Sequence, residues 1–100
     1  MSMDTVIDPD WRGLTATERD ILVVLARNGP TNSTALHRAV KRPDTQTETT
    51  TYRNLGALRD DGLVRTDAGE DKRERVNRLT PAGAALVRAG VVEMAASVEV

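Results

Sequence analysis

Apolar residues recur with helical spacing in the first third of the chain. A stripe at positions i, i+1 and i+4 consists of Ile21, Leu22 and Leu25. The four residues Thr15–Glu18 precede this stripe and match a capping box, in which the Thr hydroxyl and the Glu carboxylate each satisfy a backbone N–H. Gly29 and Pro30 follow, a residue suited to a left-handed stop and one that cannot continue a helix. The pattern predicts a helix over residues 16–28.

A short second helix is expected next, because Asn32 and Ser33 are both good N-caps and apolar positions continue to about Val40. Thr45–Glu48 is another match to the capping box and opens a third predicted helix, over residues 46–61. Its apolar face recurs every three residues and consists of Tyr52, Leu55 and Leu58.

The end of the third helix is specified by its residues. Gly62 fits the C′ position of a Schellman stop, which makes Leu58 and Leu63 the pair expected to touch. Gly56 lies inside this helix, where glycine costs about 1 kcal/mol relative to alanine. We therefore expect a neighbouring helix to approach closely at Gly56.

The period changes from helical to alternating after the third helix. The stretches Leu63–Thr66 and Arg73–Leu79 have the character of short strands, and the polar, Gly-containing segment 67–72 joins them as a β-hairpin. Thr80 and Pro81 then supply a cap and a proline at the first helical position, so a last helix should run to the mid-nineties. The prediction is a mainly α fold with one small β-hairpin.

Composition limits the function classes. One hundred residues suffice for one compact domain. The chain has no cysteine, which excludes a disulfide framework, a thiolate metal site and a cysteine nucleophile. Trp11, one of two aromatic residues, is expected to cover the core or to anchor an N-terminal arm. Because neither a signal segment nor a membrane-length apolar run is present, we expect a cytoplasmic protein without membrane contact.

Charge is unevenly distributed over the chain. The formal net charge is −1, but the stretch 38–78 holds ten Lys and Arg residues against eight Asp and Glu residues. The excess of positive charge has the sign that a nucleic acid would require, but it is small. Charge alone therefore does not argue for a nucleic-acid partner.

Three passages resemble the PadR-like and MarR-like transcriptional regulators. The passage Tyr52–Val64 is similar to the family pattern YxxLxxLxxxGLV, and Arg78–Gly83 is similar to the LTpeG that closes the wing. Leu14–Leu22 is similar to the opening of the first helix. The resemblance covers about residues 14–90 and implies a winged helix-turn-helix fold, with a three-helix DNA-binding core, a two-stranded wing and a C-terminal helix.

The resemblance also implies a division of the chain. Residues 1–13 would be a flexible N-terminal arm, residues 14–80 the winged helix-turn-helix DNA-binding domain, and residues 81–100 a C-terminal helix for dimerisation. The chain lacks room for the extra helices with which MarR proteins build a dimer and a ligand pocket. Metal sensing of the ArsR type needs Cys and His ligands, and with His37 as the lone histidine neither a metal nor another cofactor is expected.

In this resemblance the third helix enters the major groove of double-stranded DNA. Side chains on its outward face would read base edges, since Gln and Asn suit adenine, Arg suits guanine and a Thr methyl packs on thymine. These recognition residues are Gln46, Thr47, Thr49, Thr50, Arg53 and Asn54. The alternative is that the threonines are ordinary solvent-facing residues.

Cations outside the recognition helix would contact the DNA backbone or the minor groove. Lys41 and Arg42 precede the third helix, and Lys72, Arg73 and Arg75 lie in the wing. The alternative is a solvated hairpin, because nearby acidic residues partly neutralise these charges. His37 is expected to be a surface or helix-packing histidine.

The last helix carries a heptad-like apolar seam, which consists of Val87, Val91, Met94 and Val98. We expect this seam to form the interface of a homodimer, which would read two half-sites, although packing on the chain's own core is an alternative. The leading functional prediction is a sequence-specific DNA-binding regulator that represses transcription. A protein-interaction module of the same fold is the alternative, and an enzyme is not expected. The residue pattern does not identify a small-molecule effector.

Overall fold

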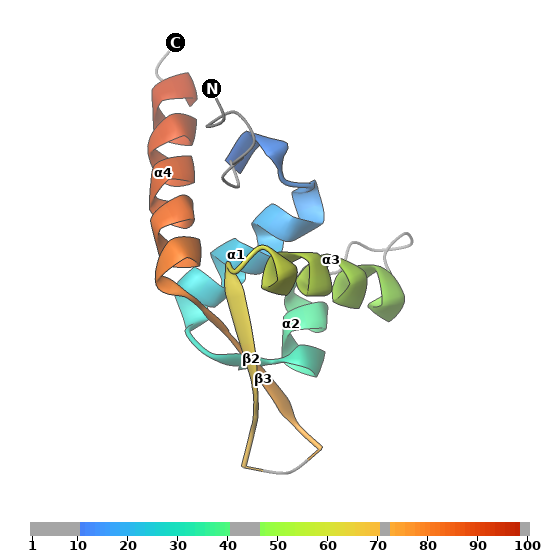
Figure 1. Cartoon of the computed structure of the whole chain (residues 1–100). Helices are drawn as coiled ribbons and strands as arrows, with labels where there is room; N and C mark the ends of the chain where they lie inside the picture. Colours follow the sequence, from blue (N-terminus) through green and yellow to red (C-terminus); the bar gives the residue numbers. More distant parts are fainter. Residues whose placement is uncertain (1–10, 41–46, 71–72, 99–100) are drawn as a thin grey trace, which may run out of the picture.

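The computed structural model describes the backbone of residues 11–40, 47–70 and 73–98, and side chains as far as residue 90. Within these residues, four α-helices and a small antiparallel sheet form a winged helix fold, as the sequence predicted (Figure 1). The elements in chain order are η2 (Trp11–Gly13), α1 (Ala16–Asn28), β1 (Thr31–Asn32), α2 (Ser33–Val40), α3 (Glu48–Asp60), β2 (Val64–Ala68), β3 (Arg75–Leu79) and α4 (Pro81–Val98).

The predicted capping box starts α1. The backbone N–H of Glu18 donates to the Thr15 hydroxyl at 3.0 Å, and the backbone N–H of Thr15 donates to the Glu18 carboxylate at 2.8 Å. Gly29 ends the helix with a φ of 74°, a conformation that glycine adopts without strain. The bounds of α1 therefore agree with the predicted 16–28.

The start of α3 differs from the prediction. The helix begins at Glu48 and not at residue 46, and its N-cap is Thr47 and not Thr45, because the Thr47 hydroxyl accepts from the backbone N–H of Thr50 at 3.3 Å. Both threonines have the side chain that a cap requires, so the local pattern alone does not choose between them.

The predicted end of α3 is confirmed in its hydrogen bonds. Gly62 has a φ of 76°, and its N–H donates to the carbonyl of Arg59 at 3.0 Å. The N–H of Leu63 donates to the carbonyl of Leu58 at 2.9 Å, and both leucines are buried. These are the two bonds of a Schellman stop.

The face that α3 buries is shifted from the predicted one. Thr51, Leu55 and Leu58 are buried at spacings of four and three residues, whereas Tyr52 is half-buried. A repeat of three drifts around a helix of 3.6 residues per turn, so the spacing of four and three keeps its residues on one side. The expected helix contact at Gly56 is wrong: a methyl group there would meet only a side-chain nitrogen of Arg59 at 3.6 Å.

The sheet has three strands in the order β1-β3-β2, all antiparallel. The predicted hairpin is present, with β3 at the centre of the sheet. β2 continues to Ala68, two residues into the predicted turn, and β3 begins at Arg75, two residues later than predicted. β1 was not predicted, because two residues are too few to show an alternating pattern. Its pairing of Thr31 with Asn77 attaches the hairpin to the beginning of α2.

The hydrophobic core is enclosed by α1, α2, α3 and the beginning of α4. Its buried members are mainly Leu, Ile and Val residues from these elements, together with Trp11. η2 lies against α4, where a methyl group added to Gly90 would collide with the Trp11 ring. Trp11 therefore covers the core, and residues 11–13 are a short helix and not part of a free arm.

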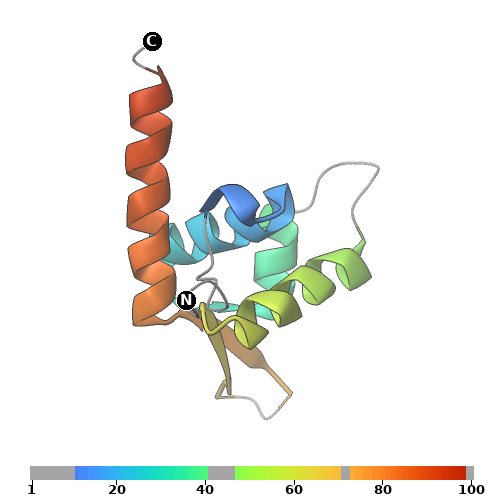
Figure 2. The same ribbon diagram turned by 45° about the horizontal axis from the view of Figure 1, so that its top comes forward.

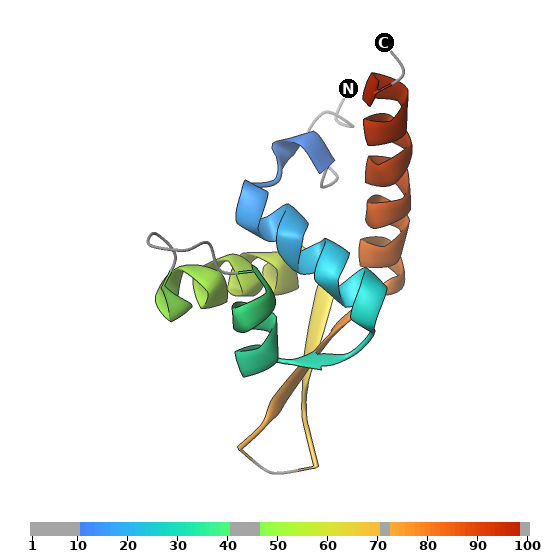
Figure 3. The same ribbon diagram turned by 180° about the vertical axis from the view of Figure 1, so that it is seen from behind.

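The C-terminal helix and the candidate DNA-facing elements lie on different sides of the molecule. α4 runs along one side of the molecule, whereas the first residues of α3 and the hairpin strands β2 and β3 project away from it (Figures 2 and 3). Within the described ranges, no helix combines the length and apolar character that crossing a bilayer requires.

Candidate nucleic-acid interface

Three contacts set the position of α3 besides its buried leucines. His37 on α2 is buried, and its Nδ1 lies 2.7 Å from the hydroxyl of Thr51, which is fully buried. The His37 ring also lies 6.2 Å from the ring of Tyr52. On the other side, the Thr15 hydroxyl at the start of α1 donates to the side-chain carbonyl of Asn54 at 2.9 Å. α3 is therefore held by both preceding helices.

His37 thus packs between α2 and α3. Of the two roles expected from the sequence, a surface histidine or a helix-packing histidine, the structure shows the second. Its hydrogen bond to Thr51 joins α2 to α3, the two helices of the helix-turn-helix unit, and helps to fix the angle between them. Sequence reasoning missed Thr51 as the partner of His37. The signal for that partnership was its spacing of four residues from Leu55, which puts both on the buried side.

Fewer of the predicted recognition residues are exposed on the first half of α3 than the sequence suggested. Thr49 and Arg53 are exposed and lie one turn apart on the same face. Thr47 is exposed, but its hydroxyl caps the helix. Thr50 is half-buried, and its hydroxyl lies 3.3 Å from that of Thr47.

Asn54 differs most from its predicted role on this helix. Its side-chain amide donates to the carbonyl of Thr50 at 2.8 Å, and its side-chain oxygen accepts from Thr15. Both polar groups of Asn54 therefore have partners within the chain. Of the remaining predicted contacts, Gln46, Lys41, Arg42 and Lys72 lie outside the described residues.

The hairpin presents cations near its tip. Arg73 and Arg75 are exposed, and the backbone N–H of Gly69 donates to the carbonyl of Glu74 at 3.0 Å across the turn. On the other face of the sheet, the carboxylate of Asp67 is contacted by Arg65 at 3.1 Å and by Arg78 at 3.3 Å. The acidic residue of β2 is therefore neutralised on the face opposite to α3.

A buried asparagine joins the hairpin to the helices. Asn77 on β3 is fully buried. Its side-chain oxygen accepts from the Thr66 hydroxyl at 2.7 Å, and its amide donates to the carbonyl of Thr31 and to the Ser33 hydroxyl, both at 3.1 Å. The same strand carries two apolar residues, Val76 and Leu79. They are three residues apart and face opposite sides, whereas Asn77 and Leu79 share the inner face.

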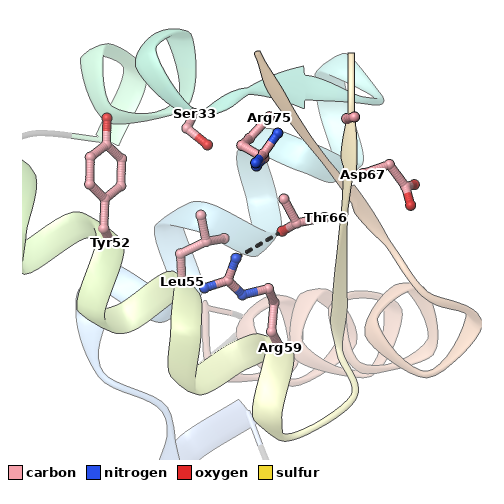
Figure 4. A pocket seen from close by; sticks show the side chains of 8 residues that line it. Ser33, Tyr52, Leu55, Arg59, Thr66, Asp67 and Arg75 are labelled. Carbon is pink, nitrogen blue, oxygen red and sulfur yellow. Dashed lines mark hydrogen bonds between the residues drawn. The ribbon is translucent and has the colours of Figure 1, made fainter. Parts of the chain in front are cut away.

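Two grooves lie between the helices and the hairpin. The larger has a volume of about 690 Å³ and separates α3 from the hairpin (Figure 4). Its lining consists of Ser33, Tyr52, Leu55, Arg59, Thr66, Asp67, Ala68 and Arg75. The smaller, of about 410 Å³, lies between the start of α2 and the hairpin and includes Arg38, Arg73 and Glu74. Arg38 and Arg59 are cations that sequence reasoning did not select.

The predicted dimer seam divides at the limit of the described side chains. Val87 is buried in the core of its own chain, so its side chain is covered without a partner. The side chains of Val91, Met94 and Val98 lie outside the described part, although α4 itself continues to Val98. Among the described residues, no three His, Cys, Asp or Glu side chains gather so that they could hold a metal ion.

No protein-family model matches the sequence, and a comparison with curated proteins gives no match either. Solved structures do match. RosR of H. salinarum is 28% identical with a TM-score of 0.78, and the match covers 88% of this chain and 80% of RosR. A probable transcriptional regulator from Pseudomonas aeruginosa is 30% identical with a TM-score of 0.66, over 75% of this chain and 55% of that protein.

A mutant of E. coli MarR in complex with operator DNA shares the fold, at 22% identity and a TM-score of 0.68. The match covers 78% of this chain but only 54% of MarR. The chain thus spans little more than half the length of MarR and of the Pseudomonas protein. The matching structures also include a MarR-family transcription regulator, at 24% identity and a TM-score of 0.76, over 87% of this chain and 56% of that protein.

Proposed function

We propose that this chain is a sequence-specific regulator of transcription that binds double-stranded DNA through α3 and the β2–β3 hairpin. The observation that carries the proposal is the exposed pair Thr49 and Arg53 on a helix that both preceding helices hold in place. A fixed helix with an exposed Arg and a Thr methyl suits the major groove, where Arg reads guanine and the methyl packs on thymine. The regulators that share this fold support the same reading, and one of them is bound to operator DNA.

Fewer side chains read bases in this proposal than the six that the sequence predicted. Thr49 and Arg53 contact bases, and Gln46 joins them by its place before the helix. Thr47 and Thr50 shape the start of α3, where the backbone N–H groups also favour a phosphate. Asn54 acts on DNA indirectly, because its two hydrogen bonds orient α3 on α1.

The remaining cations supply contacts to phosphate or to the minor groove. Arg73 and Arg75 are exposed near the tip of the hairpin. Lys72, which precedes Arg73 in the sequence, and Lys41 and Arg42, which precede α3, are proposed to add further contacts of this kind. A protein that occupies a promoter in this way acts as a repressor by blocking access to it.

The proposal includes a homodimer built on α4. In three views α4 continues past the other helices of the fold, which leaves its last turns beyond the chain's own core (Figures 1, 2 and 3). Val91, Met94 and Val98 follow the heptad-like spacing on these turns. A twofold dimer would place two copies of α3 in successive turns of the major groove. Sedimentation equilibrium of the full chain, with Met94→Glu as the disrupting variant, tests this assembly.

DNA binding itself is tested with duplex fragments enriched from the genome by the purified full chain. The dissociation constant is then measured by fluorescence anisotropy at several salt concentrations. Arg53→Gln should raise the dissociation constant by roughly 5- to 150-fold and relax preference at one base pair. Arg27→Gln, an exposed change in the last turn of α1, is the matched control and should leave the constant unchanged.

A protein-interaction module of the same fold is the second candidate, because the net charge of −1 is low for a DNA-binding protein. The two functions differ in their salt dependence. Binding to DNA releases counterions, so affinity falls steeply as salt rises. A chain that shows no salt-dependent affinity for any duplex would favour the interaction module and contradict the proposed function.

A further inference from the structure

Two arginines face the larger groove from opposite walls. Arg59 extends from α3 and Arg75 from β3, and both side chains lie in the space between the helix and the hairpin (Figure 4). Side chains alternate along a strand, so Arg75 shares the inner face of the sheet with Asn77. The groove therefore receives positive charge from two separate elements.

The carboxylate nearest this groove faces the other way. Asp67 contributes to the lining, but its side chain points away from the labelled arginines (Figure 4) and is bound by Arg65 and Arg78 on the outer face. Leu55 and Tyr52 add an apolar wall on the α3 side. Positive charge beside an apolar wall fits an anion that carries an uncharged ring or sugar.

Hydrogen bonds fix the width of the groove. The Arg59 guanidinium donates to the Thr66 hydroxyl at 3.4 Å, and that hydroxyl donates to Asn77 at 2.7 Å. Asn77 in turn donates to Ser33, on the α2 side of the groove. Arg59 is thus linked through Thr66 to one buried group, whereas the Arg75 guanidinium donates to the backbone carbonyl of Glu74 at 3.5 Å. On the Arg59 side of the groove, little reorganisation would accompany binding of an anion.

The place of the groove suggests where such an anion comes from. In duplex DNA a major groove and the neighbouring minor groove are separated by one sugar-phosphate strand. If α3 enters the major groove and the hairpin tip enters the adjacent minor groove, that strand crosses the protein between α3 and the hairpin. The groove lies between these two elements.

We propose that the groove between α3 and the hairpin holds one phosphodiester group of the DNA backbone, bound by Arg59 and Arg75. This inference rests on the proposed function and adds to it a residue, Arg59, that belongs to neither the base-reading helix face nor the hairpin tip. The deoxyribose next to the phosphate packs on Leu55 and Tyr52. The smaller groove fits this role less well, because Glu74 contributes to its lining.

The test compares the salt dependence of DNA binding in two variants of the full chain. Arg59→Gln should raise the dissociation constant for the enriched duplex about tenfold or more. It should also reduce the slope of log K against log salt by about 0.9, the value for one phosphate contact. Arg65→Gln is the matched control: its side chain is 68% exposed on the outer face of the sheet, and both quantities should stay unchanged.

A second measurement keeps the wild-type protein and changes the DNA. Each phosphate of the duplex is replaced in turn by an uncharged methylphosphonate. One replacement should weaken binding of the wild-type chain about tenfold but have little further effect on Arg59→Gln, because both changes remove the same contact. This non-additive pair would locate the phosphate that the groove holds.

The outcomes separate the two proposals. If the wild-type chain binds duplex DNA and Arg59→Gln alters neither affinity nor slope, the groove assignment is overturned while the proposed function stands. If the wild-type chain binds no duplex, both are overturned. If inorganic phosphate raises the melting temperature through Arg59 while DNA affinity is unaffected by the variant, the groove holds a free anion and the assignment to the DNA backbone is overturned.

Discussion

Replacement of Asn77 by alanine removes the group that joins the hairpin to the helices. The wild-type side chain is fully buried and makes three hydrogen bonds, to Thr66, Thr31 and Ser33. Each such bond contributes about 1 kcal/mol net to stability. The three partners are half-buried, so water can reach them in the variant and the larger penalty for a sealed unpaired group does not apply. The expected loss is therefore about 3 kcal/mol.

A loss of this size is large for a small domain, whose unfolding free energy starts at about 5 kcal/mol. It should lower the melting temperature by about 12–24 °C, at roughly 4–8 °C per kcal/mol for a domain of this length. Urea unfolding followed by far-ultraviolet circular dichroism measures the change, with an unchanged m-value as the sign that the folded state remains compact. Asn28→Ala, the same chemical change at an exposed position, is the control and should cost less than about 0.5 kcal/mol.

A double-mutant cycle identifies the bond to Ser33. Asn77→Ala and Ser33→Ala should each destabilise, and the double variant should lose less than their sum by about 1 kcal/mol, because the two single changes break one shared bond. A cost below about 1 kcal/mol for Asn77→Ala, or strictly additive effects in the cycle, would refute the view that Asn77 holds the hairpin in place.

Three further changes test the packing of the helices. Gly90→Ala should destabilise the chain by about 1–3 kcal/mol, since the new methyl group displaces the Trp11 ring. The fluorescence emission of Trp11, the only tryptophan of the chain, should shift to the red. Gly13→Ala, at a position with open space around it, is the control. Gly56→Ala should stabilise the folded chain by about 1 kcal/mol in thermal unfolding, because α3 has room for the methyl group. A destabilised variant would instead support the close helix contact that the sequence predicted at Gly56. Thr15→Ala should cost about 1–2 kcal/mol, because it removes both the cap of α1 and the hydrogen bond to Asn54, and an unchanged melting temperature would contradict both roles.

Local signals in the sequence determined most of the secondary structure. The capping box at Thr15, the stop at Gly62 and the cap at Thr80 each involve groups within five residues of one another, so their partners can be read from the local sequence. The same reasoning failed at the start of α3, where two threonines offered equivalent caps. It also failed for β1, which is a strand only because β3 lies beside it.

The candidate site depended more on tertiary structure. The sequence pointed to α3 and to the cations of the hairpin through the resemblance to winged helix regulators and the polar residues of the predicted third helix. It assigned base reading to Asn54, whose polar groups are instead bound to Thr50 and to Thr15, 39 residues away in sequence. It passed over Arg59, which reaches the groove only because β2 folds back along α3.

What the sequence by itself determined is therefore the set of helices, the hairpin and those helix ends that one local signal marks, since capping and periodicity depend on neighbours along the chain. The tertiary structure decided which polar side chains remain available to a ligand. Asn77 shows the physical reason: its partners Thr31 and Ser33 are 46 and 44 residues away. A buried amide is stable only where distant groups satisfy it, and that condition cannot be read from the strand in which it lies.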